Sequence, residues 1–281
     1  MKKQVGIIYS GKNPGKDEKL FQKLAKKKNI EIIFVNISKE IDELALGEKL
    51  KNCKVVYNNT AEDFGVEYAK TMESLGKKVI DPPKVFYFTE DKWMFFLKCK
   101  KHNISTPETV LLCENISIAK KELKKFAHWP VILKRISGTM GEYVEQANNL
   151  EHAEYIIRKF WKKGAEKLPI IAQEMIKSPS YRVTVIGGKI VQTALKENKA
   201  GWKSTGVYEK KFKKFLIDKE LKKIINKLIR ISGIQICGVD LLKKNGKWVV
   251  LEINSEPAFD FFENERGKLI SLTLNLLKKY A

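Results

Sequence analysis

Three side chains near the end of the chain have the types and the spacing of a metal site. Asp240 lies inside the apolar run 238–242, and Glu252 and Asn254 lie two residues apart in a second run, 249–254. A carboxylate and an amide at this spacing point to the same face of a β-strand. Burying an unpaired charge is costly, and Mg²⁺ takes oxygen ligands. The pattern therefore predicts a Mg²⁺ site.

The two runs predict a β-hairpin, and its turn decides whether the acids can meet. A two-residue turn at 245–246 would put Asp240 on the face opposite to Glu252. A three-residue loop at 244–246 would put both acids on one face, diagonal to each other. Strand alternation also places Val250 on the face of Glu252. We therefore expect the three-residue loop, and a two-residue turn would count against a shared metal site.

Two cations and a glycine-flanked loop suggest what the metal would serve. Lys134 closes the apolar run 129–134, and Gly138 and Gly141 flank the turn that follows. Lys92 follows an acid at the start of a predicted helix. Phosphoryl transfer needs cations at the phosphates, an amide-rich loop and a metal on carboxylates. Together with the predicted hairpin, these residues favour a nucleotide site.

The composition is that of a large globular protein. A chain of 281 residues can bury a substantial core and divide into two or three lobes. No apolar run approaches the roughly 18 residues that cross a bilayer. The 4 cysteines are scattered and form no C-x-x-C pair, which favours a reducing compartment. We expect a cytoplasmic protein without membrane contact.

The net charge of +21 has two interpretations. It could indicate a nucleic-acid surface or the attraction of an acidic substrate. Arginine supplies only 5 of the 54 basic residues, and the lysines are spread along the chain. Solvated helix faces explain such a distribution, as does enrichment in lysine and glutamate at high temperature. Nucleic acid stays an open but disfavoured partner, and a small polyanion such as a nucleotide is favoured.

The first 85 residues alternate between strand and helix. This rhythm predicts a small parallel sheet with helices on its faces. Further on, Thr89 is expected to cap a helix whose core stripe is Trp93, Phe96 and Leu97. The expected N-terminal strands are 5–9, 30–35, 53–57 and 78–80, and the expected helices are 16–28 and 62–75.

These motifs resemble the ATP-grasp superfamily. They are similar to its branch of ribosomal-protein glutamate ligases, carrier-protein lysine-pathway ligases and archaeal cofactor glutamate ligases. The likeness covers essentially the whole chain and is strongest from Lys78 onward. The segments that carry it, in order, are Asp91-Lys92 with 103–109, Trp129–Lys134 with 138–141, Gln173-Glu174-Met175-Ile176, Tyr181–Gly188, and Gly238–Asp240 with Leu251–Asn254.

The resemblance implies an α/β ATP-grasp fold. Residues 1–85 would form an N-terminal pre-ATP-grasp βαβα domain. Residues 86–172 would form the small central lobe with the phosphate loop, and residues 173–281 the C-terminal lobe with the metal hairpin.

The resemblance also implies roles for single residues. ATP would contact Lys92, Lys134, Gly138, Thr139 and Gly141 through its phosphates, and Gln173, Glu174, Met175 and Ile176 through its adenine. Arg182 would lie near the γ-phosphate, and Lys203 could supply a further cation. Asp240, Glu252 and Asn254 would hold Mg²⁺, with Mn²⁺ as an alternative.

The implied reaction is ATP-dependent amide synthesis. A small-molecule carboxylate attacks the γ-phosphorus, and an amine then displaces phosphate from the acyl phosphate. Two alternatives stay open, an ATP-grasp kinase and a nucleotide- or nucleic-acid-binding protein without turnover. The second is motivated by the basic surface and by Glu142, an acid beside the phosphate loop where the branch has glycine. A homo-oligomer is also left open.

Overall fold

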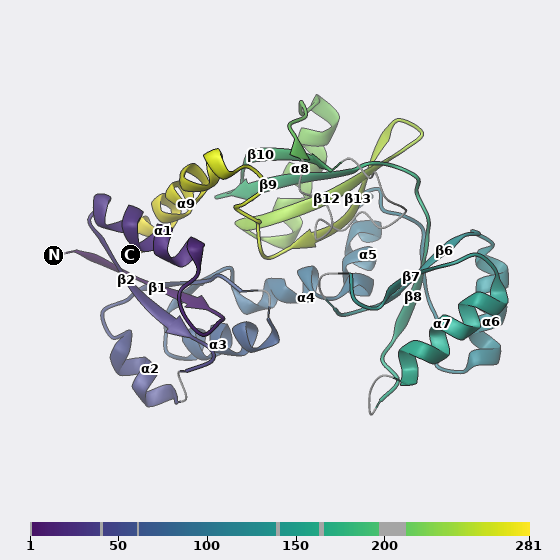
Figure 1. Cartoon of the computed structure of the whole chain (residues 1–281), viewed down its shortest axis with the longest axis horizontal. Coiled ribbons are helices and arrows are strands. Elements are labelled where there is room, and N and C mark those ends of the chain that lie inside the picture. Colours follow the sequence, from purple (N-terminus) through teal and green to yellow (C-terminus); the bar gives the residue numbers. More distant parts are fainter. Residues whose placement is uncertain (1, 40–41, 61, 139–140, 163–165, 197–211) are drawn as a thin grey trace.

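The computed structural model describes residues 2–39, 42–60, 62–138, 141–162, 166–196 and 212–281. Three sheets make up three lobes, with the N-terminal sheet at one end, the central sheet at the other, and the C-terminal sheet between and above them (Figure 1). The predicted α/β class is confirmed. Thr139 and Lys203 lie outside the described residues. Among the described helices, none combines the length and the apolar character needed to span a bilayer.

The N-terminal lobe is a parallel sheet in the strand order β2-β1-β3-β4. Helix α1 (Lys16–Lys27) packs with the C-terminal helix α9 (Glu263–Lys278) on one face. Helices α2 (Glu43–Lys49) and α3 (Asp63–Ser74) cover the other face. The βαβα prediction is confirmed, apart from α2, which was not predicted. The strands are β1 (Lys3–Tyr9), β2 (Ile30–Asn36), β3 (Val55–Asn58) and β4 (Lys78–Ile80).

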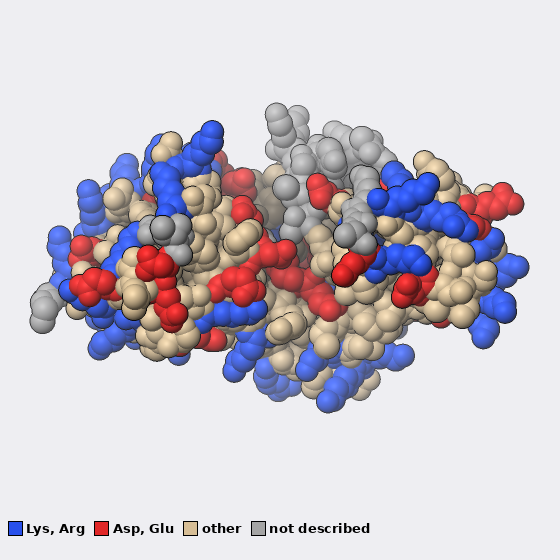
Figure 2. Space-filling model, turned by 90° about the horizontal axis from the view of Figure 1, so that it is seen from below, with Lys and Arg blue, Asp and Glu red and all other residues tan. Residues whose placement is uncertain are grey.

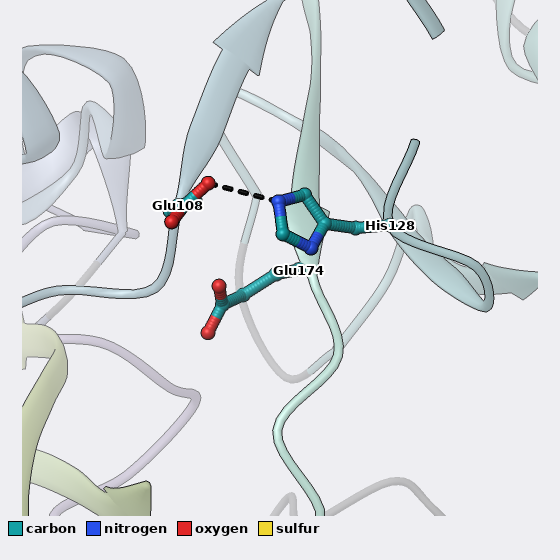
Figure 3. Close-up of side chains that lie close together, drawn as sticks. All are labelled: Glu108, His128 and Glu174. Atoms are coloured by element: carbon teal, nitrogen blue, oxygen red, sulfur yellow. Dashed lines mark hydrogen bonds and ion pairs between the residues drawn. The ribbon is translucent and has the colours of Figure 1, made fainter. Parts of the chain in front are cut away.

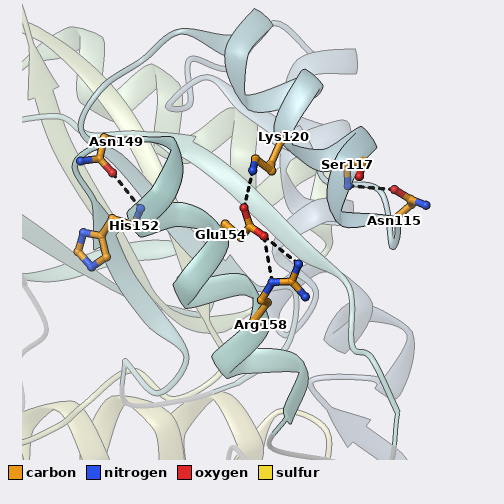
Figure 4. A network of polar contacts seen from close by, with 7 residues as sticks. All are labelled: Asn115, Ser117, Lys120, Asn149, His152, Glu154 and Arg158. Atoms are coloured by element: carbon orange, nitrogen blue, oxygen red, sulfur yellow. Dashed lines mark hydrogen bonds and ion pairs between the residues drawn. The ribbon is translucent and has the colours of Figure 1, made fainter.

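The central lobe is an antiparallel sheet in the order β5-β8-β6-β7. Its apolar core lies under α6 (Ile116–Phe126) and α7 (Leu150–Lys162). Glu154 on α7 joins the two helices through its ion pair with Lys120 of α6, and it also pairs with Arg158 one turn further along α7 (Figure 4). The strands are β5 (Thr109–Leu111), β6 (Val131–Arg135), β7 (Val144–Ala147) and β8 (Ile170–Glu174).

The C-terminal lobe is a sheet in the order β11-β10-β9-β12-β13. Helix α8 (Lys219–Ser232) packs on its apolar face. The short helices η1 (Pro83–Val85) and α4 (Phe86–Thr89), with α5 (Lys92–Lys101), also contribute side chains to this core. The strands are β9 (Ser180–Ile186), β10 (Lys189–Lys196), β11 (Phe212–Lys213), β12 (Ile236–Lys244) and β13 (Lys247–Asn254).

Two expectations for the helix at Lys92 are wrong. Asp91 caps α5 by accepting the Met94 amide at 2.8 Å, whereas Thr89 ends the preceding helix. The buried side chains of α5 are Phe95 and Cys99, and Leu97 is 40% exposed. Capping at Asp91 starts the helix two residues later than expected, and the helix buries Phe95 and Cys99 in the core of the C-terminal lobe.

The hairpin turn also differs from the prediction. Lys244 pairs with Lys247, so the turn has two residues, Asn245 and Gly246, with φ of 51° and 76°. Both angles are positive, which is typical of the tight hairpin turn that Asn-Gly favours. The expected three-residue loop is therefore wrong.

A β-bulge in β13 compensates for the shorter turn. Val250 pairs with Leu241, but the next pair is Glu252 with Asp240, which leaves Leu251 as an extra residue. An extra residue shifts all later side chains to the opposite face. Val250, which precedes the extra residue, packs in the apolar core, contrary to the alternation prediction, while Glu252, which follows it, lies beside Asp240.

A buried acid joins the N-terminal lobe to the C-terminal sheet. Asp81 follows β4, and its carboxylate accepts the backbone amides of Gln235 and Ile236 at 2.8 and 2.9 Å. The side chain is 5% exposed, and burial raises its pKa to about 7 in spite of the two amide donors. The start of β12 is thereby fixed to the end of β4.

This pKa predicts a pH dependence of stability. Because the pKa of Asp81 is raised in the folded protein, the protonated side chain contributes stability that is fully present below about pH 4. This stability is lost as the pH rises toward 7. Asp81→Asn removes the titration, so the variant should gain on the order of 2 kcal/mol relative to wild type between pH 5 and 8. Urea unfolding of both proteins at each pH measures the difference. Parallel pH profiles would contradict the prediction.

Candidate active site

Three strands place the chemical side chains in one row. Arg182 on β9 pairs with Asp240 on β12, which in turn pairs with Glu252 on β13. Asn254 lies two residues beyond Glu252 and pairs with Gly238. Side chains two residues apart on a strand share a face. The structure thus brings together Asp240, Glu252 and Asn254.

Asp240 is the most constrained of these groups. Its Oδ2 accepts hydrogen bonds from Arg182 Nη1 at 2.7 Å and from Asn254 Nδ2 at 3.1 Å. Lys196 Nζ lies 3.6 Å from Oδ1. Burial alone would raise the pKa of Asp240, but the two cations outweigh it and hold the pKa below its usual value. Asp240 is therefore ionised at neutral pH.

The residues at this face fit a hard divalent cation. Asp240 Oδ1 is buried and has no hydrogen-bond partner among the described residues. Glu252 lies directly opposite and is half-buried. Within the described part of the chain, Glu252 forms no ion pair. Two carboxylates and an amide supply oxygen donors of the kind Mg²⁺ prefers. A buried oxygen left unsatisfied is costly, so a bound cation would remove that cost.

Gly238 makes room for Arg182. A Cβ atom at Gly238 would lie 2.0 Å from Arg182 Nε. The space left by the missing side chain lets the guanidinium lie flat against β12. There it reaches Asp240, and Nη2 donates to the Glu256 carbonyl at 2.8 Å. Arg182 thereby ties the segment after β13 to the centre of the sheet.

The central sheet presents the expected cations. Lys134 on β6 is buried, and its ammonium donates to Gln173 Oε1 at 2.8 Å. Burial lowers the pKa of Lys134 to about 8, although Glu252 and Asp240 pull in the opposite direction. The ammonium group of Lys134 therefore lies within electrostatic reach of the acids of the C-terminal sheet.

Lys92 holds the start of the glycine loop. Its ammonium donates to the Gly138 carbonyl at 2.9 Å, and its backbone amide donates to the Ile136 carbonyl at 2.9 Å. Gly138 and Gly141 have φ of 131° and 73°, a region that residues with side chains rarely adopt. The glycines at the ends of the loop are thus required by its backbone.

The hinge segment leaves β8 at Glu174. The Glu174 carboxylate pairs with Lys244 at 2.7 Å and lies close to Glu108 and His128 (Figure 3). His128 Nε2 lies 2.8 Å from Glu108 Oε2. Met175 and Ile176 follow and are half-buried. The Glu174 side chain is thus engaged within this cluster, which leaves the hinge backbone as the edge that could meet a base.

Glu142 is exposed in the turn before β7, while its neighbour Tyr143 packs on Arg135, whose guanidinium carbon lies 3.6 Å from the ring centroid. Arg135 is buried and also donates to the Phe160 carbonyl, so it supports the central lobe.

Sequence reasoning missed three residues of this site. Lys196 ends β10 beside Asp240, Gly238 accommodates Arg182, and Glu90 accepts a hydrogen bond from Ser255 at 3.2 Å. Burial raises the pKa of Glu90. The position of Lys196 has a sequence feature that could have indicated it, since Gln192 and Lys196 are polar residues that share one face of β10 by alternation. The roles of Gly238 and Glu90 depend on contacts between distant segments, which no local pattern contains.

The packing of Arg182 against Gly238 predicts a stability effect. In Gly238→Ala the new methyl group must displace the guanidinium, which leaves Asp240 without its principal partner. Breaking a buried ion pair typically costs about 3 kcal/mol, and urea unfolding should show a loss of that order. The matched control is Gly267→Ala in α9, where a Cβ meets no atom within 4 Å. Equal stability of the two variants would contradict the assignment.

The chain is similar to known proteins in sequence and in fold. The model of the RimK-like ATP-grasp domain matches residues 89–278. A probable alpha-L-glutamate ligase of Marinomonas sp. (strain MWYL1) is 24% identical over 223 residues, which are 78% of this chain and 73% of the relative. The coenzyme gamma-F420-2:alpha-L-glutamate ligase of Methanocaldococcus jannaschii is 25% identical over 202 residues, 72% of this chain and 70% of the relative.

Solved structures show the same architecture. A RimK domain ATP-grasp protein from Sphaerobacter thermophilus superposes with a TM-score of 0.77 at 15% identity, covering 98% of each chain. A D-alanine–D-alanine ligase from Bacillus anthracis, complexed with ATP, superposes with a TM-score of 0.73 at 18% identity, covering 99% of this chain and 100% of the ligase. The expected ATP-grasp fold is confirmed, and the chain belongs to the RimK-like ATP-grasp family.

Proposed function

We propose that this protein is an ATP- and Mg²⁺-dependent ligase that joins a carboxylate to an amine. One observation carries the proposal. Asp240, Glu252 and Asn254 gather on one face of the C-terminal sheet, and Lys134 of the central sheet lies within electrostatic reach of Asp240 and Glu252. Carboxylates that could hold a metal and a cation that could bind phosphates thus come from two different lobes. This is the arrangement that phosphoryl transfer from ATP requires.

Each part of the site has a separate task in this reaction. Lys134 and Lys92 would bind phosphate oxygens, and the glycine loop would cover the γ-phosphate with backbone amides. Asp240, Glu252 and Asn254 would hold Mg²⁺, which when bound neutralises charge on the transferred phosphate. Arg182 would orient the acyl group from its fixed position on β9. Lys203, outside the described residues, would supply a further cation.

The chemistry proceeds in two displacements. A carboxylate oxygen attacks the γ-phosphorus, the bond to the β-phosphate oxygen breaks, and ADP leaves. The amine nitrogen then attacks the acyl carbon, phosphate leaves with the former carboxylate oxygen, and the nitrogen loses a proton. An acyl phosphate hydrolyses in water, so the lobes must exclude solvent during these steps. The relatives act on glutamate by their names, which makes an amino acid the natural class for one substrate.

Loss of a metal-binding carboxylate tests the proposal directly. Asp240→Asn and Glu252→Gln should each lower ATP-dependent phosphate release on the order of 100-fold, because charge on the phosphates is no longer neutralised. The assay screens amino acids and carboxylic acids as substrates. Hydroxylamine added to the reaction should trap an acyl hydroxamate. A kinase would release no trappable acyl group.

The control for these variants is Glu220→Gln. Glu220 is exposed on α8, on the opposite side of the same sheet, and its loss should leave turnover unchanged. If Mg²⁺-ATP raises the melting temperature of Asp240→Asn and of wild type equally, the metal assignment is wrong. Turnover that survives in both metal-site variants would overturn the proposed reaction.

The lowered pKa of Lys134 predicts proton uptake on nucleotide binding. At pH 8 about half of the Lys134 side chains are neutral in the free protein. Phosphates would favour the charged form, so binding should draw in up to about half a proton. Calorimetry of ATP binding in buffers with different ionisation enthalpies measures this uptake. It should vanish in Lys134→Met, and uptake that persists there would place its source elsewhere.

A further inference from the structure

A pocket outside the predicted nucleotide contacts adjoins the phosphate loop. Its volume is about 470 Å³, and it lies between α3 of the N-terminal lobe, α4 and the segment that precedes Gly138. Ile136 and Ser137 form its wall on the loop side, and Lys92 is bonded to this same segment. The pocket therefore adjoins the segment that leads into the proposed phosphate loop.

The charge of this pocket is opposite to that of the protein. Four acidic side chains line it, against a single lysine, Lys70, which is already paired with Glu67 at 2.8 Å. The whole chain has a net charge of +21. Figure 2 views the molecule from the side of α3 and α4 and shows acidic side chains gathered across its middle, between lysine-rich flanks. The four acids are Asp63, Glu67, Glu90 and Asp91.

These acids are held in different ways. Asp91 caps α5, and Glu90 accepts from Ser255, the residue that follows the metal-site Asn254. Asp63 and Glu67 project from α3 and are exposed. Within the described ranges, Asp63 has no ion pair. Glu90 and Asp91 thus fix the inner wall, while Asp63 and the second carboxylate oxygen of Glu67, which Lys70 does not contact, are open to a ligand.

Apolar groups complete the pocket. Phe86 is buried at its base, Val66 and Ile136 contribute aliphatic surface, and the ring of Tyr87 is 68% exposed. An aromatic ring can hold a cation over its face, and aliphatic surface packs against an alkyl chain. The complementary group is an alkyl chain that ends in a positive charge.

We propose that this pocket selects a substrate with a cationic side chain, such as an amino acid or peptide residue ending in an ammonium or guanidinium group. The inference rests on the proposed function, because it names the substrate of that site. A substrate with a second carboxylate, such as glutamate, would meet four acids here. The acidic pocket thus favours a different substrate from the glutamate that appears in the names of the relatives.

The test compares three probes of similar size and different charge. Calorimetry measures the binding of L-lysine, L-norleucine and L-glutamate to the full chain, with and without Mg²⁺ and a non-hydrolysable ATP analogue. We expect L-lysine to bind at least tenfold more tightly than L-norleucine, and L-glutamate to bind most weakly. Added salt should weaken L-lysine binding, since the acids are partly exposed.

Two variants locate the preference. Glu67→Gln and Asp63→Asn should each weaken L-lysine binding roughly tenfold and leave binding of the ATP analogue unchanged. Glu73→Gln is the matched control, because Glu73 is exposed on α3 but does not line the pocket. Thermal unfolding of each variant checks that the fold is retained.

The outcomes separate this inference from the proposed function. Two results would overturn the pocket assignment alone, provided that the ATP analogue still binds. One is the absence of any preference for L-lysine, and the other is that no probe binds at 10 mM, roughly the upper end of useful affinity. A preference for L-glutamate would overturn the assignment as well. A lysine preference that depends on Glu67, in a protein that binds no nucleotide, would instead support the pocket and overturn the ligase.

Discussion

The ion pair between Arg182 and Asp240 is the interaction on which the site depends. It lies in the middle of the C-terminal sheet, where burial would otherwise favour a neutral acid. Arg182 and Lys196 keep Asp240 charged, and the flat approach of the guanidinium requires the bare backbone of Gly238. The same arginine holds the carbonyl of Glu256. One contact thus sets the charge of the metal site and the course of the chain beyond β13.

The bulge at Leu251 is the second geometric requirement. A regular ladder with the observed two-residue turn would direct Glu252 into the apolar core, where no partner could offset its charge. The extra residue reverses the faces of the side chains that follow it in β13. Val250, before the bulge, therefore stays in the core, and Glu252, after the bulge, reaches Asp240. Bulges are frequent beside functional sites for this reason. The polar face and the apolar face of the sheet therefore coexist on a single strand.

Much of this architecture could be predicted from local pattern. The alternation of strand and helix up to residue 85, the cations Lys92 and Lys134, and the hairpin acids all follow from periodicity and spacing. The turn at Asn245-Gly246 could not be predicted correctly without the bulge. A three-residue loop was the other way to bring Asp240 and Glu252 to one face, and Leu251 has no sequence feature that marks it as a bulge. The core stripe of α5 was misplaced because Phe95 and Cys99 face the C-terminal lobe rather than a neighbour in sequence. The lobe boundaries 86–172 and 173–281 stay predictions.

The three lobes contribute different parts of the proposed site. In the proposed ligase, the central sheet supplies Lys134 for the phosphates, and the C-terminal sheet supplies the carboxylates for the metal. The N-terminal lobe, fixed to β12 through Asp81, brings α3 and its acids to the far side of the phosphate loop. Substrate choice can therefore vary in this lobe while the metal face is kept.

A high-resolution structure with Mg²⁺ and a non-hydrolysable ATP analogue tests the account most directly. We expect a metal at about 2.1 Å from Asp240 Oδ1 and from a Glu252 oxygen, with Lys134 on the phosphates. A metal bound through phosphates and water alone, with Asp240 still closed by Arg182 and Lys196, would contradict it.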